Sequence, residues 1–137
     1  MRHLELFAGI GGFRRAMDLL TQDHIMDFHC IGYSEIDAKA VKTYCANYHP
    51  EVDGELAMGD IVEFTSNKNN MDNLPQFDLV TGGFPCQTFS MMGKQAGFNE
   101  YRGQMCFHII DILAAKMPRY VLLENVKNLK SHDKGRT

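Results

Sequence analysis

The sequence predicts an α/β fold in which helices cover both faces of a doubly wound, mostly parallel sheet. Short apolar runs alternate with helical patterns from one end of the 137 residues to the other. The runs are continuously apolar, as is typical of parallel strands that are buried on both faces. Right-handed crossover connections between such strands place helices on both sides of the sheet. The hydrophobic content of 45% and the charged content of 23% are ordinary for one globular domain.

The first half of the sequence contains two predicted strand–helix pairs. Strands are expected over 3–7 and 28–34, and helices over roughly 12–21 and 37–48. Asp37 is the predicted N-cap of the second helix, because its short carboxylate can accept from the free amides of the first turn. Pro50 ends that helix, because proline disfavours the helical conformation of the residue before it.

The second half contains three further predicted strands and one long helix. The strands are expected over 55–58, 77–82 and 120–125, and the helix over roughly 103–116. Residues 61–76 are rich in Asn and Asp and predict only an undetermined connection. Ligands of open α/β sheets bind beyond the carboxyl ends of the strands. Functional groups are therefore expected in the loops after Phe7, Ser34, Met58, Gly82 and Leu123.

Composition excludes several classes of protein and site. No apolar run approaches the roughly 20 residues needed to span a bilayer, and the first residues lack the pattern of a signal peptide. A cytoplasmic protein without a membrane partner is therefore expected. The four cysteines and six histidines have no metal-ligand spacing, and Cys30, Cys45 and Cys106 are expected to pack as small apolar side chains. The net charge of −3 argues against nucleic-acid binding through electrostatics alone.

A glycine-rich segment, FAGIGG at 7–12, follows the first strand and opens the first helix. Glycines there permit positive φ angles and close approach to a ligand, and the helix N-terminus offers free N–H groups. Glu35 ends the second strand, where a carboxylate can accept both ribose hydroxyls of a nucleoside cofactor. Arg14 stands where a dinucleotide-binding loop has its third glycine, so a nicotinamide cofactor is the weaker alternative. Asp60 has two open interpretations, as an acceptor for an adenine amino group or as an N-cap.

A cysteine and a glutamate follow the last two strands. In GGFPCQTFS at 82–90, Cys86 comes directly after Pro85, which stiffens the turn. Glu124 ends the last strand, which should lie beside the strand that precedes Cys86, so the side chains of Cys86 and Glu124 would face one cleft. A protonated Glu124 could donate to a ring nitrogen, and burial would raise its pKa for that task; alternatively, it caps or bridges helices. A thiol, an acid and a nucleoside cofactor together predict covalent activation of an electron-poor ring.

Six sequence segments occur in the following order: ELFAGIGGFRRAMD, SEID, GDI, GGFPCQTFS, RGQMCFHIIDIL and LLENVKNLKSHDKG. Together they closely resemble the motifs of the catalytic half of the cytosine-5 DNA methyltransferases, and the resemblance covers nearly the whole chain. The resemblance implies the Rossmann-like fold of S-adenosylmethionine-dependent methyltransferases. It also implies methyl transfer from S-adenosyl-L-methionine to C5 of a cytosine flipped out of double-stranded DNA. Cys86 would add to C6 of the cytosine, and Glu124 would hold or protonate N3.

The same resemblance implies the remaining site residues. Those expected to contact the cofactor are Phe7, Gly9, Gly11, Glu35, Ile36, Asp60, Ile61 and Met105. Among these, Glu35 would hold the ribose and Ile36 would pack on the adenine. Those expected to form the substrate pocket and a mobile catalytic loop are Pro85, Gln87, Ser90, Lys94, Arg102 and Asn125.

The pattern departs from the family at its end. Family members continue with a Q-x-R-x-R segment, a target-recognition region and a C-terminal helix, none of which follows SHDKGRT here. We therefore expect residues 1–137 to form a partial cofactor-binding and catalytic domain without a target-recognition domain, and with apolar surface exposed. One interpretation is a split enzyme of bacterial or phage restriction–modification type, whose second chain supplies recognition. The alternatives are an inactive or non-catalytic S-adenosylmethionine-binding fragment, and a fragment of a tRNA cytosine-5 methyltransferase.

Overall fold

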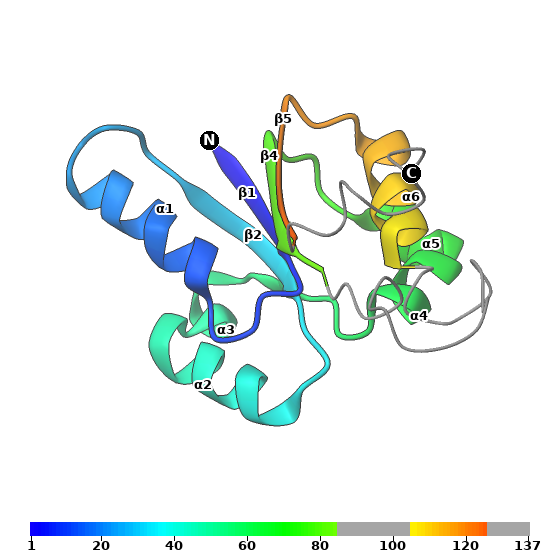
Figure 1. The fold of residues 1–137 in the computed structure, drawn as a ribbon, viewed down its shortest axis with the longest axis horizontal. Helices are drawn as coiled ribbons and strands as arrows, with labels where there is room; N and C mark the ends of the chain where they lie inside the picture. The colour runs from blue at the N-terminus through cyan, green and yellow to red at the C-terminus, as the bar shows by residue number, and fades with distance from the viewer. Residues whose placement is uncertain (85–104, 126–137) are drawn as a thin grey trace.

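The computed structural model describes residues 1–84 and 105–125 (Figure 1). Five strands form one sheet: β1 (Arg2–Leu6), β2 (His29–Ser34), β3 (Leu56–Ala57), β4 (Leu79–Gly83) and β5 (Tyr120–Glu124). All pairs are parallel, and the order is β3-β2-β1-β4-β5. The chain thus starts at the centre of the sheet and winds outward in both directions, which confirms the predicted doubly wound sheet.

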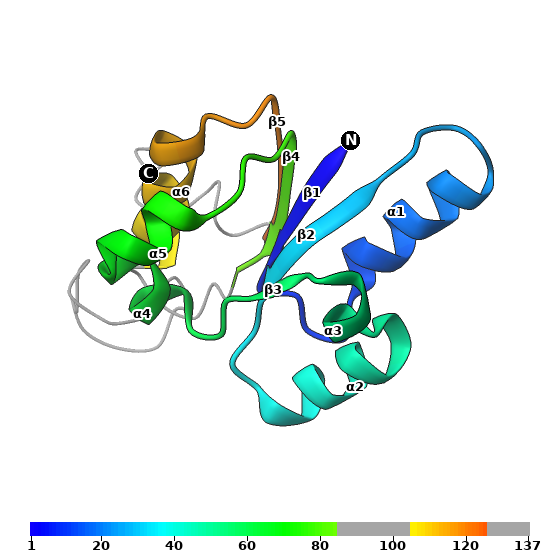
Figure 2. The same ribbon diagram turned by 180° about the vertical axis from the view of Figure 1, so that it is seen from behind.

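Helices cover both faces of this sheet. One layer contains α1 (Gly12–Gln22), α2 (Ala38–Tyr48) and α3 (Pro50–Asp53), and the other contains α4 (Ile61–Ser66), α5 (Lys68–Asn73) and α6 (Met105–Lys116) (Figures 1 and 2). The connection over 61–76, which the sequence left undetermined, consists mostly of α4 and α5. Asp60 and Asn67 are their N-caps and accept from backbone amides two residues later, at 2.8 and 3.0 Å. Asp and Asn side chains in and before this segment therefore supply helix caps.

The central strand β1 presents different chemistry to the two helical layers. Leu4 and Leu6 are fully buried in the main apolar core, together with side chains of α4 and α6. The alternate residues, His3 and Glu5, are also fully buried but are polar. Glu5 Oε1 accepts from the backbone amide of Arg14 in α1 at 3.3 Å, which places this polar face under α1. The strand is therefore apolar on one face only, although both faces are buried.

Strand β5 forms an apolar edge of the sheet. Tyr120, Val121, Leu122 and Leu123 are between 40% and 48% exposed, although their continuous apolar sequence predicted a buried strand. Within the described sheet β5 pairs with β4 on one side only, so its other edge presents free backbone groups. The expected exposure of apolar surface is confirmed here.

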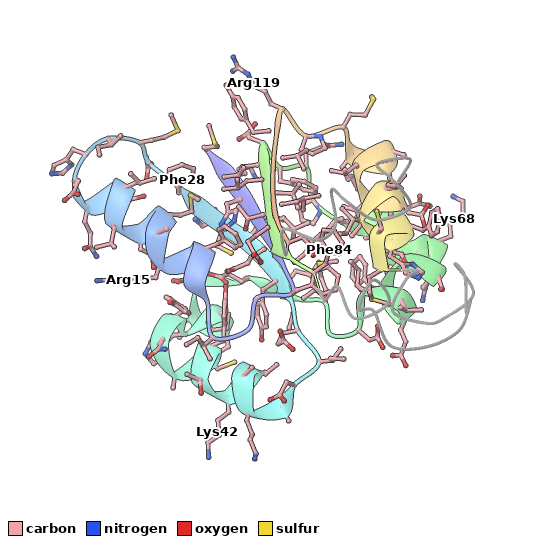
Figure 3. The ribbon with its side chains drawn as sticks, viewed as in Figure 1. Arg15, Phe28, Lys42, Lys68, Phe84 and Arg119 are labelled. Carbon is pink, nitrogen blue, oxygen red and sulfur yellow. The ribbon has the colours of Figure 1, made fainter. Side chains whose placement is uncertain are left out.

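Several charged side chains are exposed on the described part of the chain, whereas its cysteines differ in exposure. Arg15, Lys42 and Lys68 point away from the layers (Figure 3). The prediction that the cysteines pack as small apolar side chains is confirmed for the buried Cys30 and the half-buried Cys45. It is wrong for Cys106, which is exposed on α6.

A search of residues 1–84 and 105–125 for membrane-spanning helices finds none with the necessary length and hydropathy.

The ends of α2 follow local sequence signals. Asp37 is the N-cap, and its Oδ1 accepts from the amides of Lys39 at 2.8 Å and Ala40 at 2.9 Å. At the other end His49 has a left-handed φ of 47°, and Pro50 begins α3. The predicted N-cap and the predicted end of the helix are both confirmed.

We expect Asp37→Ala to lower the free energy of unfolding by about 1 kcal/mol, because two amides of the first turn lose their acceptor. Asp37→Asn keeps a side-chain oxygen at the same position and should be close to wild type. Urea denaturation followed by circular dichroism compares the three proteins. An alanine variant as stable as wild type would contradict the capping role.

Candidate active site

The loop between β1 and α1 contains three residues with positive φ: Phe7 at 54°, Gly9 at 56° and Gly11 at 89°. Phe7 is unusual among them, because a non-glycine residue in this region costs on the order of 1–3 kcal/mol. The amide of Gly11 donates to Ala8 O at 2.8 Å, and the amide of Ala8 donates to Ser34 O of β2 at 2.9 Å. The loop is therefore tied to the carboxyl ends of both β1 and β2.

Glu35 lies between this loop and the start of α2. Its Oε2 accepts from the amide of Gly9 at 2.8 Å, and its Oε1 accepts from the amides of Ile36 and Asp37, each at 2.8 Å. Each carboxylate oxygen has two acceptor positions. Oε1 already has two donors and Oε2 has one, so Oε2 retains the capacity to accept from a ribose hydroxyl. The structure brings the glycine loop and Glu35 together, as the sequence predicted.

The surroundings of Glu35 fit the nucleoside half of S-adenosyl-L-methionine. A Cβ added to Gly9 would meet nothing within 4 Å, so the loop borders open space there. Ile36, next to Glu35, is 69% exposed. An exposed apolar side chain beside a carboxylate suits a flat ring attached to a hydroxylated sugar, because such sites combine apolar contact with a few oriented polar groups.

Three of the residues predicted to contact the cofactor, Asp60, Ile61 and Met105, have structural roles in the described fold. Asp60 caps α4, with Oδ1 accepting from the amide of Val62 at 2.8 Å, so its interpretation as an N-cap is confirmed. Ile61 and Met105 are 2% and 6% exposed and belong to the main apolar core. Contacts of these residues with the cofactor stay predictions.

Arg14 joins α1 to the region before β3. Its guanidinium donates to Asp18 Oδ1 at 3.0 Å, forms an ion pair with the buried Glu55, and lies 5.3 Å from the centre of the Tyr48 ring. A large anchored side chain thus stands where dinucleotide-binding loops have a glycine. This arrangement counts against a nicotinamide cofactor. The sequence carried no signal for Glu55 or Tyr48, because each contacts Arg14 only through the packing of distant segments.

The carboxyl ends of β4 and β5 lie side by side, as predicted. Gly83 pairs with Glu124, and a Cβ added to Gly83 would lie 3.2 Å from Glu124 Oε2. Asn125 Nδ2 donates to Phe84 O at 3.1 Å and so joins the end of β5 to the residue that precedes Pro85. The expected burial of Glu124 is wrong in the described fold. Its side chain is exposed because β5 is the edge strand.

The remaining predicted site residues lie outside the described residues. They are Pro85, Cys86, Gln87, Ser90, Lys94 and Arg102. Their roles stay predictions.

A buried polar layer lies under α1, behind the glycine loop. Burial raises the pKa of Glu5 to about 7. Burial and the Arg14 charge lower the pKa of His3 to about 4. His3 Nε2 lies 2.8 Å from Thr81 Oγ1, whereas His3 Nδ1 and Glu5 Oε2 have no hydrogen-bond partner within the described fold. The available sequence signal was the pair of polar residues inside the strand segment HLELF.

Glu5 and His3 shift the pH dependence of stability in opposite directions. The folded state favours neutral Glu5, so the stability contributed by the neutral form is present below its usual pKa and is lost as the pH rises through about 7. The folded state also favours neutral His3, so that contribution is present above its usual pKa and is lost as the pH falls through about 4.

We expect Glu5→Gln to gain stability relative to wild type as the pH rises from 4.5 to 8, by about 3 kcal/mol at most. The variant keeps a side-chain oxygen for the Arg14 amide but cannot ionise. Urea denaturation at several pH values measures the difference. His3→Gln is the matched control and should gain relative to wild type as the pH falls. Parallel pH profiles for wild type and Glu5→Gln would show that Glu5 does not titrate as proposed.

Comparison with known proteins extends over the whole chain. Residues 1–137 match the model of the C-5 cytosine-specific DNA methylase family. The chain is 42% identical over 137 residues to the orphan methyltransferase M.Rho11sI of Bacillus phage rho11s, which covers 100% of this chain and 25% of that protein. It is 45% identical over 134 residues to the type II methyltransferase M.NlaX of Neisseria lactamica, which covers 98% of this chain and 39% of that protein. The chain thus spans well under half the length of these relatives.

Solved structures show the same similarity in three dimensions. The crystal structure of S. pombe Dnmt2 methyltransferase matches with a TM-score of 0.71 and 26% identity, over 98% of this chain and 38% of that chain. A mutant of Spodoptera frugiperda DNMT2 matches with a TM-score of 0.62 and 25% identity, over 96% of this chain and 37% of that chain. The fold is therefore the Rossmann-like fold of S-adenosylmethionine-dependent methyltransferases, and this chain belongs to the C-5 cytosine-specific DNA methylase family.

Proposed function

We propose that this chain provides the cofactor-binding and catalytic part of an enzyme that transfers a methyl group from S-adenosyl-L-methionine to C5 of cytosine in DNA. The observation that carries the proposal is the register of β4 and β5, which pairs Gly83 with Glu124. The carboxyl group of Glu124 therefore lies beside the end of β4, and Cys86 follows Gly83 by three positions in the sequence. The glycine loop and Glu35, which would bind the nucleoside, follow β1 and β2 at the same edge of the sheet.

In this proposal the Cys86 thiolate forms a bond to C6 of a cytosine that has left the DNA stack. Glu124 donates to N3, so that negative charge does not build up on the ring. The bound cofactor would supply an electrophilic methyl group; C5 accepts it as the bond from the methyl group to the sulfonium sulfur breaks, which leaves S-adenosylhomocysteine. Water then takes the C5 proton, the Cys86 sulfur leaves C6 as the thiolate, and the C5–C6 double bond is restored. The N3 proton returns to Glu124. The incoming base would cover the exposed Glu124 and exclude water from this contact.

The cofactor would be held mainly at the ends of β1 and β2. Oε2 of Glu35 would accept from a ribose hydroxyl while the carboxylate keeps its bonds to the amides of Gly9, Ile36 and Asp37. The exposed Ile36 would pack on the adenine ring. Gly9 and Gly11 would allow the backbone to approach the ligand closely, because both have positive φ.

We also propose that a second chain supplies the surface that recognises DNA. The net charge of −3 gives this chain little attraction for phosphates. The apolar edge strand β5, with four large side chains at least 40% exposed, is the kind of surface that a protein partner covers. The named relatives come from a phage and a bacterium, which supports a cytoplasmic enzyme of such a host. The type II name of M.NlaX supports a place in a restriction–modification system.

The cofactor proposal predicts that S-adenosylhomocysteine raises the midpoint of thermal unfolding of this chain, because it binds only the folded form. Glu35→Ala should weaken its binding by roughly 1–3 kcal/mol, or about five- to 150-fold in Kd, since the ribose hydroxyl loses its acceptor. Calorimetric titration measures the Kd values. Asp37→Asn is the matched control, because it removes a negative charge from the same turn, keeps the N-cap of α2 and should leave Kd unchanged. Unchanged affinity in Glu35→Ala would remove Glu35 from the site.

The covalent mechanism predicts that Cys86→Ser abolishes methyl transfer to cytosine in DNA and leaves S-adenosylhomocysteine binding intact. Transfer of labelled methyl groups is measured with this chain alone and with a second chain that carries a target-recognition region. Wild-type turnover by Cys86→Ser would exclude the covalent step. Full activity of the 137-residue chain alone would instead exclude the need for a second chain.

A further inference from the structure

Tyr48, the last residue of α2, reaches back to the glycine loop. Its hydroxyl donates to Gly11 O at 2.8 Å. Its ring fills the space that a side chain at position 11 would need, because a Cβ added to Gly11 would lie only 2.8 Å from Tyr48 Cζ. Loop and ring therefore fit each other closely enough to require glycine at this position.

Gly11 is the residue at which the loop becomes a helix. It is the N-cap of α1, has a φ of 89°, and provides no side-chain capping bond. Its amide donates to Ala8 O at 2.8 Å, and its carbonyl accepts from the amide of Arg15 at 2.9 Å, as the first hydrogen bond of the helix. The Tyr48 hydroxyl is a further donor to the same carbonyl. The conformation of Gly11 thus depends on contacts from both α1 and α2.

The position of Tyr48 is itself restricted by its neighbours. Its ring centre lies 4.8 Å from that of the fully buried Tyr44, and the Arg14 guanidinium lies 5.3 Å from the ring centre. Burial raises the pKa of the Tyr48 hydroxyl, which therefore stays protonated and able to donate near neutral pH. A donor held in place by two packed neighbours can restrict the loop that it contacts.

We propose that Tyr48 is a positioning residue that holds the glycine loop, residues 7–12, in the conformation that binds the nucleoside of the cofactor; this inference rests on the proposed cofactor site. Glu35 holds the loop at the amide of Gly9, and Tyr48 holds it at the carbonyl of Gly11. Without the second contact the loop has more conformations to lose on binding, and this loss of entropy lowers affinity.

Tyr48→Phe is the variant that isolates this contact, because it removes the hydroxyl and keeps the ring. Tyr33→Phe is the matched control. Tyr33 also stacks on Tyr44, with ring centres 4.2 Å apart, but its hydroxyl lies 3.6 Å from Cys45 Sγ and not at the loop carbonyl. The two variants therefore lose the same group from the same aromatic cluster.

Two measurements on the full chain test the proposal. Amide hydrogen exchange of Gly11 and Arg15 reports on the loop, and exchange of the fully buried Val80 in β4 reports on global unfolding. We expect Tyr48→Phe to accelerate exchange at Gly11 and Arg15 about two- to tenfold, as for the loss of one neutral hydrogen bond, and to accelerate exchange at Val80 by no more than this factor. We expect the Kd for S-adenosylhomocysteine to rise by about the same factor. Tyr33→Phe should change neither quantity.

The outcomes distinguish failure of the proposed role of Tyr48 from failure of the proposed cofactor site. Faster exchange at Val80 with unchanged exchange at Gly11 and Arg15 would mean that Tyr48 contributes only to global stability and would overturn the proposal. An unchanged Kd in a chain that binds S-adenosylhomocysteine would also overturn it, even if exchange at Gly11 became faster. A wild-type chain that does not bind S-adenosylhomocysteine would instead remove the proposed cofactor site, whereas faster local exchange in Tyr48→Phe would still show that Tyr48 fixes the loop.

Discussion

All five strands of the sheet run parallel, and the position of every candidate functional group depends on this constraint. The carboxyl ends of parallel strands share one edge, so loops that are distant in the sequence meet there. The glycine loop follows β1, Glu35 follows β2 and Glu124 ends β5. Crossovers place α1 to α3 on one face and α4 to α6 on the other, as Figures 1 and 2 show. The helices therefore enclose the faces of the sheet, and the functional groups collect at its edge.

The glycine loop is a strained segment that several weak contacts hold in place. Phe7 alone has a backbone conformation that costs on the order of 1–3 kcal/mol. A neutral hydrogen bond contributes only about 1 kcal/mol net, so a single contact does not offset this cost. Glu35 at the Gly9 amide, Ser34 at the Ala8 amide and Tyr48 at the Gly11 carbonyl act together. The loop is thus organised before any ligand arrives, which reduces the entropy lost on binding.

The two faces of β1 contribute to the fold in different ways. Leu4 and Leu6 join the apolar core under α4 and α6, where burial of apolar area supplies stability. His3 and Glu5 lie under α1, where a buried polar group is costly unless it is hydrogen-bonded. The bond from the Arg14 amide to Glu5 partly offsets that cost and aligns the first turn of α1 with the end of β1. The polar layer therefore favours one placement of the helix that carries the glycine loop.

Local sequence was sufficient for the fold class, the parallel strands, the N-cap at Asp37 and the end of α2 before Pro50, because periodicity, capping and proline geometry act between residues close in the chain. It was also sufficient to predict that the glycine loop meets Glu35 and that β5 lies beside β4. It was not sufficient for the helices over 61–76, whose N-caps resembled loop residues, or for the exposure of Glu124. Nor did it indicate the contacts of Tyr48 with Gly11 and of Arg14 with Glu55. Exposure and partner choice depend on which distant segments pack together, and only the assembled sheet and its helices determine that.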